Sequence, residues 1–314
     1  FHNINMKKRI KINKTIIFCL FIFYLISILS ISSTLNYLPE TLNNLVIKQT
    51  IFYILGIILI FIMINIDLNI LINKAKYIYL LNVFLLLLVL LIGTETNGIK
   101  AWFYIPIFGS FQPSEFMKIS LILYLGNIIN KNRKNEQSDL NLIIKCLIIT
   151  LIPSILTFLE PDTGAVIVYF VILIVMLFVS GINLKWFIYF IFLGILGIGS
   201  ILYLYLYKQD LFINIFGSSL FYRLDRLFDF INLSGMQLNN SIISISSSGI
   251  FGHGINNIPI YFPELQTDFI FASFTSCFGL LGSIILIMTI FIFDKEIINI
   301  AKNKKENIYK YHHD

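Results

Sequence analysis

One short stretch of the chain carries two opposite charges beside a long apolar run. The sequence FGSFQPSEFMKISLILYLG, residues 108–126, places Glu115 and Lys118 three residues apart at the start of an expected helix. Residues at this spacing share a helix face, so the pattern predicts an ion pair. Buried charges normally pair, but ionisable side chains inside membranes usually serve a site. The pair is therefore either a structural salt bridge or part of a polar cavity.

A second acidic stretch has a similar form. The sequence TFLEPDTGAVIVYF, residues 157–170, places Glu160 and Asp162 on either side of Pro161 and before a further apolar run. Both stretches gather carboxylates at the mouth of an expected helix. Together they predict a polar site at the ends of several helices.

A third candidate lies further along the chain, in residues 221–272. Arg223 and Arg226 stand at i and i+3, and Asp225 and Asp229 at i and i+4, so each pair shares a face if 221–231 is helical. A salt-bridged interfacial helix is the alternative interpretation. The following SSSGIFGHG turn could offer backbone N–H groups to an anion. Its glycines are Gly249, Gly252 and Gly254.

The elements that must position these residues are membrane helices. The chain is 57% hydrophobic and 13% charged, and its mean hydropathy is +0.84, which excludes a water-soluble globule. Its apolar runs are mostly long enough to cross a ~30 Å hydrocarbon core. We predict an all-α polytopic membrane fold with eight spans, at residues 15–33, 46–66, 75–93, 113–130, 141–159, 164–181, 184–206 and 269–293.

Basic residues predict the orientation of these spans. They precede the first span, follow the last, and lie between each even-numbered span and the next one. Lys74 and Lys76, for example, are assigned to the connection between spans two and three. The positive-inside rule makes that side the cytoplasm, with the N-terminus inside. The acidic stretches then face outward, which predicts a site for a polar lipid headgroup. The expected parts of one integral membrane domain, 1–314, are helices 1–7 at 15–206, an outer loop at 207–268, helix 8 at 269–293 and a basic tail at 294–314.

Several functional classes find no support in the sequence. The +6 net charge is explained by topology, so we expect no nucleic-acid partner. The three cysteines lie in or beside spans without a CxxC motif, which argues against a disulfide framework or a zinc site. We expect no nucleotide or haem, and the absence of an internal repeat gives no support to an inverted-repeat transporter.

Four ordered motifs resemble the SEDS family of peptidoglycan polymerases, which includes RodA, FtsW and SpoVE. They are NGIKAWFYIPIFGSFQPSEFMK at 97–118, EPDTGAV at 160–166, QLNNSIISISSSGIFGHG at 237–254 and FPELQTDFIFA at 262–272. The resemblance implies a multi-pass protein of the bacterial cytoplasmic membrane with a ten-helix fold, of which we expect eight helices here. Motif residues on which it rests are Trp102, Gln112, Pro113, Ser114, Pro161, Gly164, Gly249, Gly252 and Gly254.

The resemblance implies an inverting transfer that joins lipid II units into glycan strands during elongation, division or sporulation. A carboxylate would act as general base, and cationic groups or a divalent ion, Mg²⁺ or Mn²⁺, would stabilise the leaving pyrophosphate. Expected partners are lipid II, a class B penicillin-binding protein (a transpeptidase) and membrane lipids. The expected base is Asp229, and the expected cavity or substrate residues are Glu115, Lys118, Asp162, Arg223, Arg226, Gln237, Ser241 and Asp268.

The chain departs from the family pattern at three places. Ala101 stands where members usually have Arg, and Thr275 and Ser276 stand where they usually have two Glu. The short piece that carries the family's proposed catalytic Asp is also missing between Asn232 and Gln237, which leaves Asp229 as the nearest acid. Two alternatives to polymerisation therefore stay open: a lipid II flippase, and an inactive scaffold for the transpeptidase.

Overall fold

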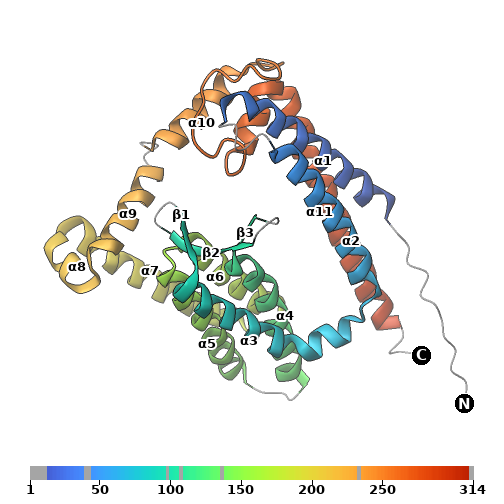
Figure 1. Cartoon of the computed structure of the whole chain (residues 1–314). Helices are drawn as coiled ribbons and strands as arrows, with labels where there is room; N and C mark the ends of the chain where they lie inside the picture. The colour runs from blue at the N-terminus through green and yellow to red at the C-terminus, as the bar shows by residue number, and fades with distance from the viewer. Residues whose placement is uncertain are drawn as a thin grey trace, which may run out of the picture. The chain divides into compact units, whose positions relative to one another are not determined.

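The computed structural model in Figure 1 is predominantly helical, which confirms the all-α polytopic class. In the described part of the chain, six helices are long and apolar enough to cross a membrane. The chain forms two compact units, one made of Phe1–Ile64 with Leu204–Asp314 and the other of Asn65–Tyr203. The residues described are 13–38, 44–96, 99–105, 109–134, 138–231 and 235–310.

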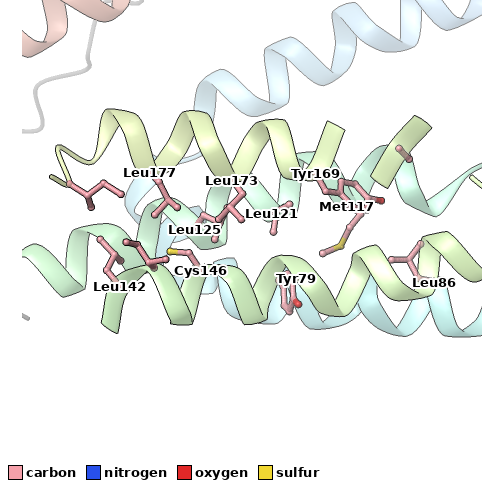
Figure 2. Packing of buried hydrophobic residues seen from close by; sticks show 13 residues of the cluster. Tyr79, Leu86, Met117, Leu121, Leu125, Leu142, Cys146, Tyr169, Leu173 and Leu177 are labelled. Atoms are coloured by element: carbon pink, nitrogen blue, oxygen red, sulfur yellow. The ribbon is translucent and has the colours of Figure 1, made fainter. Parts of the chain in front are cut away.

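The unit Asn65–Tyr203 is built around a bundle of four helices. They are α3 (Leu68–Ile92), α4 (Pro113–Lys134), α5 (Asp139–Leu159) and α6 (Thr163–Val179). Their facing sides are filled by apolar side chains, shown in Figure 2, which include Leu86, Met117, Leu121, Cys146, Tyr169 and Leu173. This core fixes the ends of α4, α5 and α6, where the acidic stretches lie.

A small antiparallel sheet, which was not predicted from the sequence, precedes α4. Its strands are β1 (Thr94–Thr96), β2 (Ile99–Ile105) and β3 (Gly109–Phe111), in the order β1-β2-β3. Tyr104 pairs with Ser110, and Gly109 takes a positive φ of 91° where β3 begins. Because β3 leads directly into Pro113, the sheet sets where α4 starts.

The other unit is organised by α1 (Lys14–Thr34) and α11 (Ile270–Lys310), which run side by side (Figure 1). At one end, the Asn13 side-chain amide donates to Glu296 at 2.8 Å. At the other, the hydroxyl of Tyr37 donates to the Ile258 carbonyl at 3.0 Å; Tyr37 is the last residue of the short helix η1 (Leu35–Tyr37). The remaining helices are α2 (Leu45–Asn65), most of which lies in this unit, and α8 (Gln209–Phe216), α9 (Ser218–Ile231) and α10 (Met236–Ser247). Helix α7 (Leu184–Tyr207) continues from one unit into the other.

Several predicted boundaries differ from the structure. The third span begins at Leu68 instead of residue 75. Asp67 caps this helix, because its side chain accepts from the backbone N–H of Asn69 at 2.9 Å. Lys74 and Lys76 therefore lie inside α3 and not in a connecting loop. The segment 207–268, expected as a loop, contains three helices, and the helix expected over 221–231 is part of α9. Helix α11 continues past residue 293 into the expected tail.

Two of the eight predicted spans do not meet the criteria of length and apolar composition for crossing a membrane. Helix α6 is apolar but has only 17 residues. Helix α4 has 22 residues, but it carries Glu115 and Lys118 near its start and further basic residues near its end. The polar start of α4 is the part that joins the candidate site.

Candidate functional site

Asp162 joins the two acidic stretches of the sequence into one polar cluster. Its Oδ2 atom accepts from the Gln112 side-chain amide at 2.9 Å and from the Ser114 hydroxyl at 3.4 Å. Its Oδ1 atom accepts from the backbone N–H of Ala165 at 3.0 Å, so Asp162 is also the N-cap of α6. The segments 97–118 and 160–166, which carry two of the sequence motifs, therefore meet at a single carboxylate.

A buried tyrosine ties the same cluster to α5. The Tyr169 hydroxyl donates to the Ser114 carbonyl at 3.0 Å and lies 3.4 Å from the Thr157 hydroxyl. Tyr169, Ser114 and Thr157 are all fully buried. Three helices thus share one hydrogen-bonded junction, which holds Asp162 in a defined position.

Glu160 is the most unusual acid of this junction. It lies in the turn between α5 and α6 and is 0% exposed, and neither of its carboxyl oxygens has a hydrogen-bond partner among the described residues. Burial, together with the nearby charge of Asp162, raises the pKa of Glu160 to about 8. Glu160 was part of the acidic stretch but not of the predicted site, because burial cannot be read from the sequence.

Glu115 and Lys118 form the predicted ion pair. The Lys118 ammonium lies 2.6 Å from a Glu115 carboxylate oxygen. The side chains are 55% exposed for Glu115 and 25% exposed for Lys118, so the pair lies on the surface of the unit. It is therefore available to a ligand and contributes little to stability if water reaches it.

The other predicted motif residues of this unit lie around the same helix ends. Trp102 is on β2, where its carbonyl accepts from the Thr94 hydroxyl at 3.0 Å. Pro113 occupies the first position of α4, which suits a residue without a backbone N–H. Pro161 lies between the two acids, and Gly164 lies in the first turn of α6. These residues shape the backbone around Asp162.

Helix α9 carries the predicted base and cations of the other unit. The Tyr205 hydroxyl donates to the Asp225 carboxylate, so that acid already has an internal partner. Arg223, Arg226 and Asp229 are in the same helix, but their side chains are outside the described part of the structure. The predicted shared faces of these residues therefore remain a prediction.

The remaining predicted residues lie on α10 and around the start of α11. The Gln237 amide donates to the Pro263 carbonyl at 3.4 Å, and the buried Ser241 hydroxyl donates to the Leu238 carbonyl at 2.7 Å. Asp268 is exposed just before α11. Gln237 and Ser241 therefore already serve internal contacts, and Asp268 is the more accessible of the three.

The glycine turn does not have the role expected of it. The turn was expected to offer backbone N–H groups to an anion, but those of Gly252, His253 and Gly254 already donate to carbonyls of the chain. The anion-binding hypothesis is wrong for these groups, because Gly252 donates to Ser248 within the turn and His253 and Gly254 donate to carbonyls of α11. The sequence pattern identifies the glycines, but it does not show which carbonyl groups accept hydrogen bonds from the backbone of the turn.

The predicted site residues fall into two groups. Glu115, Lys118 and Asp162 belong to the unit Asn65–Tyr203, whereas the residues of α9, α10 and Asp268 belong to the other unit. Among the described residues, no group of three or more His, Cys, Asp or Glu side chains could hold a metal ion. The described side chains thus do not provide a complete site for the expected divalent ion.

Sequence comparisons identify a family with this pattern of motifs. The family model of FtsW/RodA/SpoVE cell cycle proteins matches residues 11–311. The probable peptidoglycan glycosyltransferase FtsW of Wigglesworthia glossinidia brevipalpis is 32% identical over an alignment of 315 positions. The alignment covers 95% of this chain and 78% of the relative. Stage V sporulation protein E of Bacillus subtilis is 30% identical over 252 residues, which cover 77% of this chain and 64% of the relative.

Solved structures share the fold. One chain, from work on the structural coordination of polymerization and crosslinking by a peptidoglycan synthase complex, aligns with a TM-score of 0.71 and 21% identity. The alignment covers 90% of this chain and 76% of that one. The crystal structure of the rod shape determining protein RodA of Thermus thermophilus aligns with a TM-score of 0.57 and 22% identity, over 90% of this chain and 72% of that one.

Proposed function

This chain belongs to the FtsW/RodA/SpoVE family of cell cycle proteins, and we propose that it is a peptidoglycan glycosyltransferase that polymerises lipid II. The observation that carries this proposal is the bond between Gln112 and Asp162, at 2.9 Å. It joins two motifs that lie 50 residues apart in the sequence. Such a built junction at the mouths of three helices is suited to holding a polar headgroup beside a lipid chain.

The proposed reaction is an inverting transfer between two lipid-linked sugars. The C4 hydroxyl of an incoming lipid II attacks the anomeric carbon of the growing strand, forming a new C–O bond. The bond from that carbon to the undecaprenyl pyrophosphate breaks, and the pyrophosphate leaves with the electron pair. A carboxylate takes the proton of the attacking hydroxyl, which raises its nucleophilicity in the transition state.

The residues of the chain can be assigned to these roles. We assign the general base to Asp229, because Asp225, the other acid of α9, is engaged by Tyr205. Charge on the leaving pyrophosphate would be stabilised by Arg223 and Arg226, which belong to the same helix as Asp229. Asp162 has both oxygens occupied by donors, so it acts by shaping the site and not as the base.

A divalent ion, Mg²⁺ or Mn²⁺, stays part of the proposal as an added ligand. When bound it would neutralise pyrophosphate charge. The described residues supply no complete protein site for it.

The orientation of the chain in the membrane stays a prediction. The cytoplasmic location of the N-terminus rests on the distribution of basic residues between the spans.

A second candidate function is that of an inactive scaffold for a class B penicillin-binding protein. Four residues, LSGM, separate Asn232 from Gln237. A polymerase needs a base in this region, and the shortened piece would remove it. In this alternative, the chain still binds the transpeptidase but forms no glycan polymer.

The test is a polymerisation assay with purified protein in detergent. The full-length protein is mixed with its transpeptidase partner, lipid II and Mg²⁺ or Mn²⁺, and glycan strands are separated by gel electrophoresis. Polymer is expected, and it would exclude a pure flippase because detergent leaves no bilayer to cross. If no polymer forms while the partner still binds, the scaffold is the correct function.

A further inference from the structure

Helix α11 is broken inside the apolar part of its sequence. Gly279 has φ 64° and ψ −160°, values that no helical residue adopts, and the chain is helical on both sides of it. A break in a helix leaves N–H and C=O groups without their usual partners. In a membrane span such groups need partners within the protein, because lipid offers none.

The turn after α10 supplies these partners. The N–H groups of Leu280 and Leu281 donate to the carbonyls of Gly249 and Ile250, at 3.0 and 3.2 Å. In the opposite direction, the N–H groups of His253 and Gly254 donate to the carbonyls of Ser276 and Cys277, at 2.8 and 3.1 Å. Residues 248–254, named here the wedge, therefore complete the hydrogen bonding of the broken helix.

Two glycines make this close approach possible. A Cβ atom on Gly252 would lie 2.3 Å from the Cys277 carbonyl oxygen, and one on Gly279 would lie 2.4 Å from the Gly252 nitrogen. Both glycines have positive φ, at 78° and 64°. The rigid backbone atoms on both sides leave no room for a side chain, so the wedge and the break are built for each other.

The depth of the break follows from the charges of α11. Asp294 is the first charged residue after Gly279, and 294 − 279 gives 15 residues, or ~22 Å of helix at ~1.5 Å per residue. The bond from Asn13 to Glu296 places the start of α1 at the same end. In a hydrocarbon core of ~30 Å, Gly279 then lies about 8 Å inside the boundary opposite Asp294.

The wedge presents apolar side chains at this depth. Phe251 is 78% exposed and Ile250 58% exposed, and both precede the Gly252 that contacts α11. We propose that the wedge is a re-entrant turn that inserts Ile250 and Phe251 among the acyl chains of the bilayer leaflet opposite Asp294. The expected outer loop thus enters the membrane at one point. This placement is independent of whether the chain polymerises lipid II.

Spin labels can measure the depth of the wedge directly. In full-length protein with Cys19, Cys146 and Cys277 changed to Ala, single cysteines at Phe251, Ile285 and Thr267 are labelled with a nitroxide in phosphatidylcholine–phosphatidylglycerol bilayers. Ile285, in the middle of α11, is the lipid reference, and the exposed Thr267 is the water reference. At Phe251 we expect collisions with oxygen to exceed those with a water-soluble nickel chelate, as at Ile285. A label at Phe251 that behaves like that at Thr267 would overturn the proposal.

The glycine contact provides a second measurement. Gly252→Ala should push the wedge off the break and move the Phe251 label into water, increasing its collisions with the nickel chelate severalfold. Gly56→Ala, in α2, is the matched control, because a Cβ there meets nothing within 4 Å. If Gly252→Ala leaves the accessibility of the Phe251 label as it is in the parent, the contact does not hold the wedge in the bilayer and the proposal fails.

Discussion

Glu160 and Asp162 lie two residues apart in the same turn, yet their carboxyl groups have opposite environments. Asp162 accepts hydrogen bonds at both oxygens, from Gln112, Ser114 and Ala165. Glu160 is fully buried, and its oxygens have no partner among the described residues. Burial without a hydrogen-bond partner therefore favours the neutral form of Glu160, whereas Asp162 is held in place by its three donors.

The stability of the unit Asn65–Tyr203 should depend on pH through Glu160. Burial, with the charge of Asp162, raises the pKa of Glu160 from 4.5 to about 8. The folded protein then holds a proton that the unfolded chain releases between these values. The stabilisation is fully present below about pH 4.5 and is lost as pH rises to about 8. At ~1.4 kcal/mol per pH unit, the total change is a few kcal/mol.

Tryptophan fluorescence can follow this dependence during unfolding in detergent. Both tryptophans, Trp102 and Trp186, lie in the same unit as Glu160. Wild type should lose stability from pH 5 to pH 8.5, whereas Glu160→Gln should lose little. Glu115→Gln removes an exposed acid of the same unit, so its free energy of unfolding should depend on pH as that of wild type does. If the free energy of unfolding of Glu160→Gln depends on pH as that of wild type does, Glu160 is not the titrating group.

Asp162→Ala should destabilise the protein more than the loss of an ordinary helix cap. The change removes the cap of α6 and also leaves the Gln112 and Ser114 donors without their acceptor, so we expect a loss of about 2–4 kcal/mol. Asp67→Ala is the control, because Asp67 caps α3 with a single bond and should cost about 1 kcal/mol. Equal losses for the two variants, measured by unfolding in the same detergent, would contradict the proposed junction.

The Glu115–Lys118 pair should contribute little to stability despite its short distance. Its exposure predicts a coupling energy of at most ~1 kcal/mol in a double-mutant cycle of Glu115→Gln and Lys118→Met. A pair buried in lipid would show a larger effect, because the removal of one partner would leave a costly lone charge. A measured coupling of about 3 kcal/mol or more would show that the pair is shielded from water.

The sequence contained enough information for the fold class, the order of the helices and the acidic junction. Apolar runs of span length mark most helices directly, and the spacing of Glu115 and Lys118 correctly predicts their contact. The start of α3 was missed because Lys74 and Lys76 were interpreted as a loop signal, whereas the Asp67 cap extends the helix over them.

The missed features all depend on tertiary contacts. The strands at 94–111 are too short for a periodic signal, and their pairing depends on each other. The break at Gly279 has no local marker besides the glycine, since its partner is a turn about 30 residues earlier. For Glu160 the sequence shows an acid in a turn, and only packing makes it a fully buried one.

The polymerisation of lipid II by wild type and by acid variants of α9 tests the central claim most directly. Under identical conditions with the transpeptidase partner and a divalent ion, we expect wild type to form glycan polymer and Asp229→Asn to form at least 100-fold less, as loss of a general base commonly costs ~10²–10⁴ in rate. Asp225→Asn, which retains a side chain able to contact Tyr205, should keep most of the activity. Equal polymer from Asp229→Asn and wild type would contradict the assignment of the base, and no polymer from wild type would contradict the proposed activity itself.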